Sequence, residues 1–204
     1  MTSPQEYETP DQAALSIRAE SGDAEAQFEL GKHLDQPGGT QQNKQAAFHW
    51  YVKAAEQGHT EAQFAVGLLY SLGEGVSRND EFAVNWFLKA AKAGMADAQF
   101  NVGLMNYLGE GVDQNYEQAC RWFLKAAEQG HAKAQFNLGV MYANGEGVKA
   151  DAVETGKWWT LAAMQGHPAA QSLLESVQEQ LTADELRIVQ ESTASWFSDR
   201  PLTD

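Results

Sequence analysis

A block of 36 residues recurs along this 204-residue chain with almost no drift. Each copy carries the tripeptide Ala-Gln-Phe, and Gln171 opens a fifth, degraded copy. The tripeptide begins at Ala26, Ala62, Ala98 and Ala134. Self-similarity at this period predicts stacked supersecondary units, none of which can bury its own apolar face alone. The pattern favours a chain that presents a surface over one that encloses a reaction.

Each copy has the pattern of two helices separated by a glycine-rich turn. In the second copy, helical patterns cover about residues 61–71 and 81–93, with Gly73 and Gly75 between them. Glycine tolerates the left-handed backbone that a helix end needs. Asn79, or the aspartate after it, can cap the second helix. The sequence therefore predicts an all-α fold of stacked helix pairs.

Glycine also recurs in the middle of the first helix of each copy, where it costs about 1 kcal/mol relative to alanine. A cost that returns in every copy indicates that a neighbouring helix approaches closely at this point. We therefore expect a large side chain at Gly67 or Gly103 to overpack the contact between the helices.

These features resemble the Sel1-like repeat, a relative of the tetratricopeptide repeat. The best matches are Ala-Gln-Phe-Asn-Leu-Gly-Val-Met-Tyr at 134–142, Gly-Glu-Gly-Val at 145–148, and the helix that begins at Trp122. The resemblance covers about residues 23–171. It implies a right-handed α-solenoid whose first helices line a concave face. It also implies a non-catalytic scaffold that binds other proteins in signalling, envelope and host-interaction pathways.

The repeats suggest one domain with a cap at each end. We expect a tail and capping helix over 1–22, and a degraded fifth repeat, capping helix and tail over 169–204. Thr182 and Glu185 form the pattern of a capping box at the start of the last helix. The four repeats within 23–168 are expected at about 23–59, 60–95, 96–131 and 132–167.

The net charge of −14 limits the classes of partner. An acidic balance argues against nucleic acid and anionic membranes, and favours a basic partner or simple solubility. The single cysteine, Cys120, excludes an intrachain disulfide. No signal-peptide pattern or apolar run of membrane-spanning length is visible. We expect a cytoplasmic protein, with a monomer favoured.

A second apolar stripe on the first helices predicts the partner-binding site. In the second copy, Ala62, Val66 and Leu69 form the expected core stripe, and a further stripe lies on the opposite side. In the family geometry this second stripe faces the concave groove, where it would bind a peptide or helix of a partner protein. The candidate residues are Phe64, Leu68, Leu72, Phe100, Leu104, Tyr107 and Leu108, with an acidic rim of Glu25, Glu29, Glu61 and Asp97.

Other interpretations of the stripe stay open at this point. The phenylalanines recur in every copy, which favours packing, whereas the leucines and Tyr107 vary between copies and fit either packing or binding. The stripe fades to polar residues in the first and fourth copies. The chain's own C-terminal helix is a further candidate to fill the groove.

Patterns for catalysis, cofactors or metals are missing from the sequence. There is no Gly-x-Ser-x-Gly elbow and no pair of helix-face histidines with a carboxylate. His59, His131 and His167 occupy the same turn position in different copies, so stacking separates them. We therefore expect no enzyme and no cofactor. The alternative to a scaffold is an immunity or antitoxin protein that neutralises a basic toxin or secreted effector.

Overall fold

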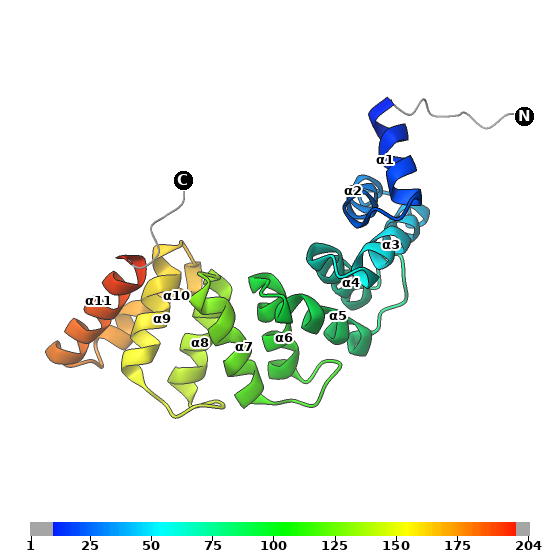
Figure 1. Ribbon diagram of the computed structural model, residues 1–204. Helices are drawn as coiled ribbons and strands as arrows, with labels where there is room; N and C mark the ends of the chain where they lie inside the picture. The colour runs from blue at the N-terminus through cyan, green and yellow to red at the C-terminus, as the bar shows by residue number, and fades with distance from the viewer. Residues whose placement is uncertain (1–9, 199–204) are drawn as a thin grey trace, which may run out of the picture. The chain divides into compact units, whose positions relative to one another are not determined.

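A computed structural model describes residues 10–198, without the side chains of Pro10 and Phe197. Within this range the chain forms eleven α-helices and no strand, which confirms the all-α fold (Figure 1). The helices are α1 Pro10–Glu20, α2 Ala24–Leu34, α3 Gln41–Glu56, α4 Thr60–Leu72, α5 Asp80–Lys92, α6 Ala96–Leu108, α7 Tyr116–Glu128, α8 Ala132–Asn144, α9 Ala152–Met164, α10 Pro168–Gln178 and α11 Ala183–Ser198.

The helices group into two compact units, Met1–Ala93 and Gly94–Asp204, called unit 1 and unit 2 below. In unit 1, α2 pairs with α3 and α4 pairs with α5, while α3 also contacts α4. In unit 2, α6 pairs with α7 and α8 pairs with α9, while α7 contacts α8 and α9 contacts α10. Contacts between successive helices are what a repeat solenoid predicts.

Close packing of an aromatic ring on a glycine joins the two helices of each pair. A Cβ atom at Gly67 in α4 would lie 2.6 Å from Cδ1 of Phe87 in α5. A Cβ atom at Gly103 in α6 would lie 2.6 Å from Cδ1 of Phe123 in α7. Both rings are almost fully buried. The close approach predicted at the mid-helix glycines is therefore confirmed.

The glutamine of the Ala-Gln-Phe motif is buried and links successive helices. Gln135 in α8 is 0% exposed, and its Nε2 donates to the carbonyl oxygen of Ala127 at 3.1 Å. Its Oε1 accepts from Nε2 of Gln165 at 2.6 Å. Gln63 makes the matching bond to the carbonyl oxygen of Ala55 at 3.2 Å. The glutamine thus adds a second hydrogen bond to a carbonyl at the end of the preceding helix, which also accepts from a backbone N–H of the following turn.

The Gly-Glu-Gly turn of one copy rests on the second helix of the copy before it. The position that a Cβ of Gly75 would take is occupied by the carbonyl group of Lys44, at the start of α3. The matching position at Gly147 is occupied by the backbone of Tyr116, at the start of α7. Both glycines have a positive φ, near 70°. Only glycine fits this combination of backbone angle and close approach.

The C-terminal helix α11 packs on the side of the second helices. Its predicted capping box is present, with the Thr182 backbone N–H donating to Glu185 at 2.8 Å. A Cβ at Gly156 in α9 would lie 3.3 Å from side-chain atoms of both Leu181 and Val189. Trp196 packs on the core formed by α7, α8 and α9. Helix α11 therefore lies against α9 and does not fill the surface of α6 and α8.

None of the helices within residues 10–198 combines the length and apolar character that a bilayer crossing requires.

Candidate functional site

The predicted partner-binding residues divide between the two units. In unit 1, Phe64 and Leu68 are half-buried, and the Phe64 ring lies 5.5 Å from the buried ring of Phe87. Leu72, at the end of α4, is 64% exposed. The α4 stripe thus runs from a packing residue at one end to a free apolar side chain at the other.

In unit 2 the stripe lines a hollow of about 200 Å³ between α6 and α8. Leu104 and Tyr107 are half-buried at its wall, and Leu108 is 49% exposed at its edge. The complete lining is Leu104, Tyr107, Leu108, Phe123, Phe136, Asn137 and Val140. This set, called the α6–α8 hollow, holds three residues that were predicted from the sequence.

Helix α8 supplies most of the lining that was not predicted from the sequence, and α7 adds the buried Phe123. Phe136, Asn137 and Val140 line it, although the fourth copy was expected to lie at the polar end of the groove. A signal was available, because Phe136 and Val140 occupy the repeat positions of Phe100 and Leu104. The stripe of the fourth copy was nevertheless expected to fade, because the polar Asn144 occupies the position of Leu108.

Phe100, the remaining aromatic candidate, does not line the hollow, although it contacts a residue that does. Its ring stacks on His131 at 4.6 Å and lies 5.7 Å from the Phe123 ring. Phe136 repeats this arrangement, with His167 stacked at 4.4 Å. The recurring phenylalanines therefore have packing roles, and Phe136 also reaches the hollow.

The acidic candidates each have a partner within their own unit. Glu25 lies 3.2 Å from Nε2 of His59, and Asp97 lies 3.2 Å from Nε2 of His131. Glu61 lies 3.5 Å from Nδ1 of His59. Glu29 lies 2.7 Å from Nζ of Lys32. The contacts of Glu25 and Asp97 therefore join the first helix of one copy to the N-cap of the next copy's first helix.

The histidines at the repeat turns cap the first helices, a role that was not predicted from the sequence. Nδ1 of His131 accepts from the backbone N–H of Ala134 at 3.1 Å, and Nδ1 of His167 accepts from Ala170 at 3.4 Å. Accepting this bond requires Nδ1 to be unprotonated. Burial lowers the pKa of His131, against the opposing effect of Asp97, and burial also lowers the pKa of His167.

A carboxylate lies next to the hollow on the turn after α8. The Tyr107 hydroxyl donates to Oε2 of Glu146 at 2.9 Å. This bond is the main cause of a raised Tyr107 pKa, which keeps the hydroxyl protonated as the donor. In unit 1 the equivalent turn residue, Glu74, forms an ion pair with Lys44 instead.

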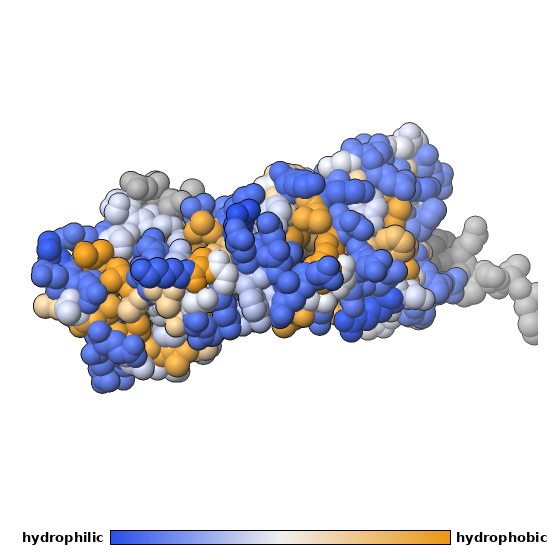
Figure 2. All heavy atoms as spheres, turned by 90° about the horizontal axis from the view of Figure 1, so that it is seen from below, coloured by the Kyte–Doolittle hydropathy of each residue, from blue (hydrophilic) through white to orange (hydrophobic). Residues whose placement is uncertain are grey.

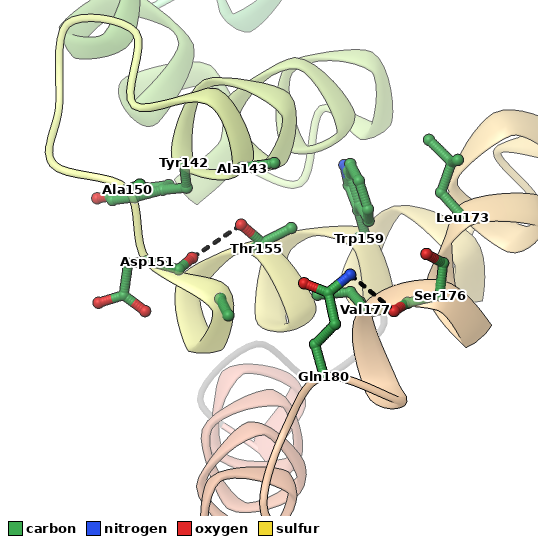
Figure 3. A pocket seen from close by; sticks show the side chains of 11 residues that line it. Tyr142, Ala143, Ala150, Asp151, Thr155, Trp159, Leu173, Ser176, Val177 and Gln180 are labelled. Atoms are coloured by element: carbon green, nitrogen blue, oxygen red, sulfur yellow. Dashed lines mark hydrogen bonds between the residues drawn. The ribbon is translucent and has the colours of Figure 1, made fainter.

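A second pocket, of about 290 Å³, lies between α8, α9 and α10 (Figure 3). It is located at the start of α9. In the fourth copy the Gly-Glu-Gly turn covers the start of α7, but the degraded fifth copy has no such turn to cover the start of α9. Thr155 donates to the carbonyl of Asp151 at 2.8 Å, and Gln180 donates to that of Ser176 at 3.1 Å. These polar groups are satisfied within the chain, so the pocket offers little to orient a ligand.

Further apolar side chains reach the surface of unit 2 near the C-terminal end. Met164, Leu173 and Ile188 are 63%, 39% and 48% exposed. Figure 2 shows apolar residues among hydrophilic ones at the end of the molecule that carries α11.

Across residues 10–198, no group of three His, Cys, Asp or Glu side chains could hold a metal ion.

Known proteins identify the repeat and its fold. The Sel1 repeat model matches residues 24–59, 60–95, 96–131 and 132–167. A Sel1 repeat protein from Oxalobacter formigenes is 36% identical, with a TM-score of 0.70 over 81% of this chain and 65% of that one. A protective antigen of uropathogenic Escherichia coli, which has an SLR fold, is 31% identical, with a TM-score of 0.59 over 91% of this chain and 48% of that one.

More distant comparisons add nothing on function. An immunity protein from Pseudomonas aeruginosa is 19% identical, with a TM-score of 0.39 over 86% of this chain and 80% of that one. This likeness is too low to support an immunity role. No curated protein matches the chain. The present chain spans less than two thirds of the Oxalobacter protein and about half of the E. coli antigen. Since the repeat model covers most of its length, the chain belongs to the Sel1 repeat family.

Proposed function

We propose that this protein is a non-catalytic scaffold and that its α6–α8 hollow binds an apolar side chain from a peptide or helix of a partner protein. Sel1 repeat proteins generally mediate protein–protein interactions. The observation that carries the finer proposal is the hollow itself, which has Leu104, Leu108 and Val140 in its wall.

The size of the hollow supports a protein partner over a small molecule. Its volume of about 200 Å³ is below the roughly 300–1,000 Å³ of pockets that enclose drug-sized ligands. A single large apolar side chain is a better match. Burying one such side chain contributes about 1.5–3 kcal/mol. A contact of this size is typical of the central anchor of an interface.

The chemistry of the wall also supports binding over catalysis. Six of its seven residues are apolar or aromatic, and Asn137 is the polar member. An amide side chain can donate to and accept from a peptide group. The wall contains no acid, base or thiol that could act in catalysis.

Selection from a random dodecapeptide library on phage tests the proposal, because it works without an identified partner. The immobilised targets are the wild-type protein, Leu108→Asp and Leu72→Asp. The two leucines occupy the same repeat position and both are largely exposed, but only Leu108 lines the hollow. Circular dichroism checks that both variants remain folded.

We expect the wild type and Leu72→Asp to enrich the same peptides, each with a large apolar residue. Leu108→Asp should lose this enrichment, because it introduces a charge at the edge of the hollow. If no peptide family is enriched on the wild type, or if Leu108→Asp selects the same family as the wild type, the hollow is not the binding site.

A further inference from the structure

The hollow of unit 2 has an oriented negative charge at one edge. Tyr107 lines the hollow, and its hydroxyl holds the Glu146 carboxylate at 2.9 Å. The carboxylate is therefore one hydrogen bond away from the apolar wall. A carboxylate that accepts a bond from a protein donor has a restricted position, which favours a defined contact with a ligand.

A comparison of equivalent turns shows that the charge of Glu146 is not compensated. Glu74 occupies the same position two repeats earlier, where Lys44 forms an ion pair with it. The counterpart of Lys44 in the third copy is Tyr116, which has no charge. Within residues 10–198, no lysine or arginine forms an ion pair with Glu146.

Two basic side chains of unit 2 form ion pairs with carboxylates other than Glu146. Lys157 pairs with Glu154 at 3.1 Å, and Arg121 pairs with Glu117 at 2.5 Å. Lys149, three residues after Glu146, lines a separate hollow with Trp158.

The ends of two helices add to the negative potential at this edge. Helix α6 ends at Leu108, which lines the hollow, and α8 ends at Asn144, two residues before Glu146. The C-terminus of a helix carries a partial negative charge of about half an electron. Glu110, on the turn after α6, is exposed and adds another carboxylate. A cation is therefore favoured over an anion at this edge.

We propose that the partner segment carries a lysine or arginine within about one helical turn of the apolar residue that enters the hollow, and that this basic group binds Glu146. The inference rests on the proposed function, because the hollow must first bind the apolar residue. Arginine suits the site best, since its planar group can bind a carboxylate through two parallel hydrogen bonds.

The same dodecapeptide library tests this preference, with Glu146→Gln and Glu74→Gln as added targets. The two variants have the same net charge, so the comparison removes the general attraction of basic peptides to an acidic protein. We expect the wild type and Glu74→Gln to enrich a large apolar residue with a lysine or arginine within four positions. Glu146→Gln should keep the apolar residue and lose the basic preference.

A synthetic peptide from this family should bind Glu146→Gln about three- to tenfold more weakly than the wild type in a calorimetric titration. The difference should shrink as salt is raised, because dissolved ions screen the attraction between the two charges. Enrichment of apolar residues without a basic neighbour would overturn this inference and leave the proposed function intact. Equal losses in Glu74→Gln and Glu146→Gln would also overturn it. Failure to enrich any apolar residue would overturn both.

Discussion

Unit 1 and unit 2 have the same core but differ in the contacts outside it. The second, third and fourth copies bury side chains at the same repeat positions. A Cβ atom added at Gly67 would lie 2.6 Å from the Phe87 ring, and one added at Gly103 would lie equally close to the Phe123 ring. Outside this core, Glu74 is paired with Lys44, whereas Glu146 is held by the neutral hydroxyl of Tyr107.

The difference separates the residues that build the repeat from those available for recognition. A position that packs between helices is constrained in the same way in every copy, because each copy meets an equivalent neighbour. A position on the outer surface of the first helices is free of this constraint. The α6–α8 hollow and its charged edge arise at such positions.

The largest expected effect tests whether the two cores are equivalent. Gly67→Leu and Gly103→Leu should each lower the free energy of unfolding by about 1–3 kcal/mol or more, because a side chain would collide with a buried ring. Urea unfolding measures both. Asn85→Leu, at an exposed position in α5, is the control. A large loss in only one of the two glycine variants would show that the cores differ.

A second substitution compares an inner repeat with the degraded one. Gln135→Leu should cost about 1–3 kcal/mol, because it removes two hydrogen bonds of a fully buried side chain, one to the carbonyl of Ala127 and one from the amide of Gln165. Gln171→Leu should change stability by less than about 0.5 kcal/mol, since this glutamine is exposed. Thermal or urea unfolding distinguishes them. Similar losses would mean that the bond to Ala127 is not the source of the effect.

The sequence predicted the repeat and its helices because their signals lie within one copy or recur between copies. The 36-residue period gave the register of the helix pairs, and the mid-helix glycines indicated where the rings pack. The sequence also predicted the capping box at Thr182 and Glu185, because the two residues that form it lie within one helical turn. Asn79 caps α5 as predicted, accepting from Phe82 at 3.0 Å.

The candidate site was less predictable, because it depends on contacts between copies. Leu104, Tyr107 and Leu108 were named from one helix and do line the hollow, but partner binding remains a prediction. The contributions of Phe136 and Val140 required the placement of α8 beside α6. The difference between Glu74 and Glu146 depends on the helix beneath each turn, which the turn sequence does not reveal.

A smaller effect is expected from the contacts that hold the two turns. Tyr107→Phe should lower stability by about 0.5–1.5 kcal/mol through loss of its hydrogen bond to Glu146. Lys44→Met should cost about 0.2–1 kcal/mol, since the Lys44–Glu74 pair is partly exposed. High salt should reduce only the second loss. Equal salt dependence of the two variants would contradict the view that an uncharged hydroxyl holds Glu146 and a charged ammonium group holds Glu74.

The smallest expected effect concerns pH and compares repeats with and without a histidine cap. Burial lowers the pKa of His131 and His167 in the folded chain. The unfolded chain therefore binds protons first as the pH falls below about 6.5, and stability decreases until the lower folded pKa is passed. In His131→Asn, a cap that does not titrate, stability should fall less between pH 7.5 and pH 5.5. The third copy has Met95 at the N-cap of α6, so this position adds nothing to the pH dependence of the free energy of unfolding.

The outcome that would contradict this pH assignment is an unchanged slope in His131→Asn. Urea midpoints measured at intervals across the same pH range provide the comparison. Measurements stay above pH 5.5, so that the titration of ordinary carboxylates does not enter.

The central claim is that the α6–α8 hollow of unit 2 binds the partner segment. The most direct test is an NMR titration of protein with labelled leucine and valine methyl groups, using a peptide selected from the library. We predict that the largest shift changes fall on Leu104, Leu108 and Val140, with Leu68 and Leu72 of unit 1 unaffected. Largest changes on Leu72, or on Leu173 beside the second pocket, would contradict the claim and place the binding surface elsewhere.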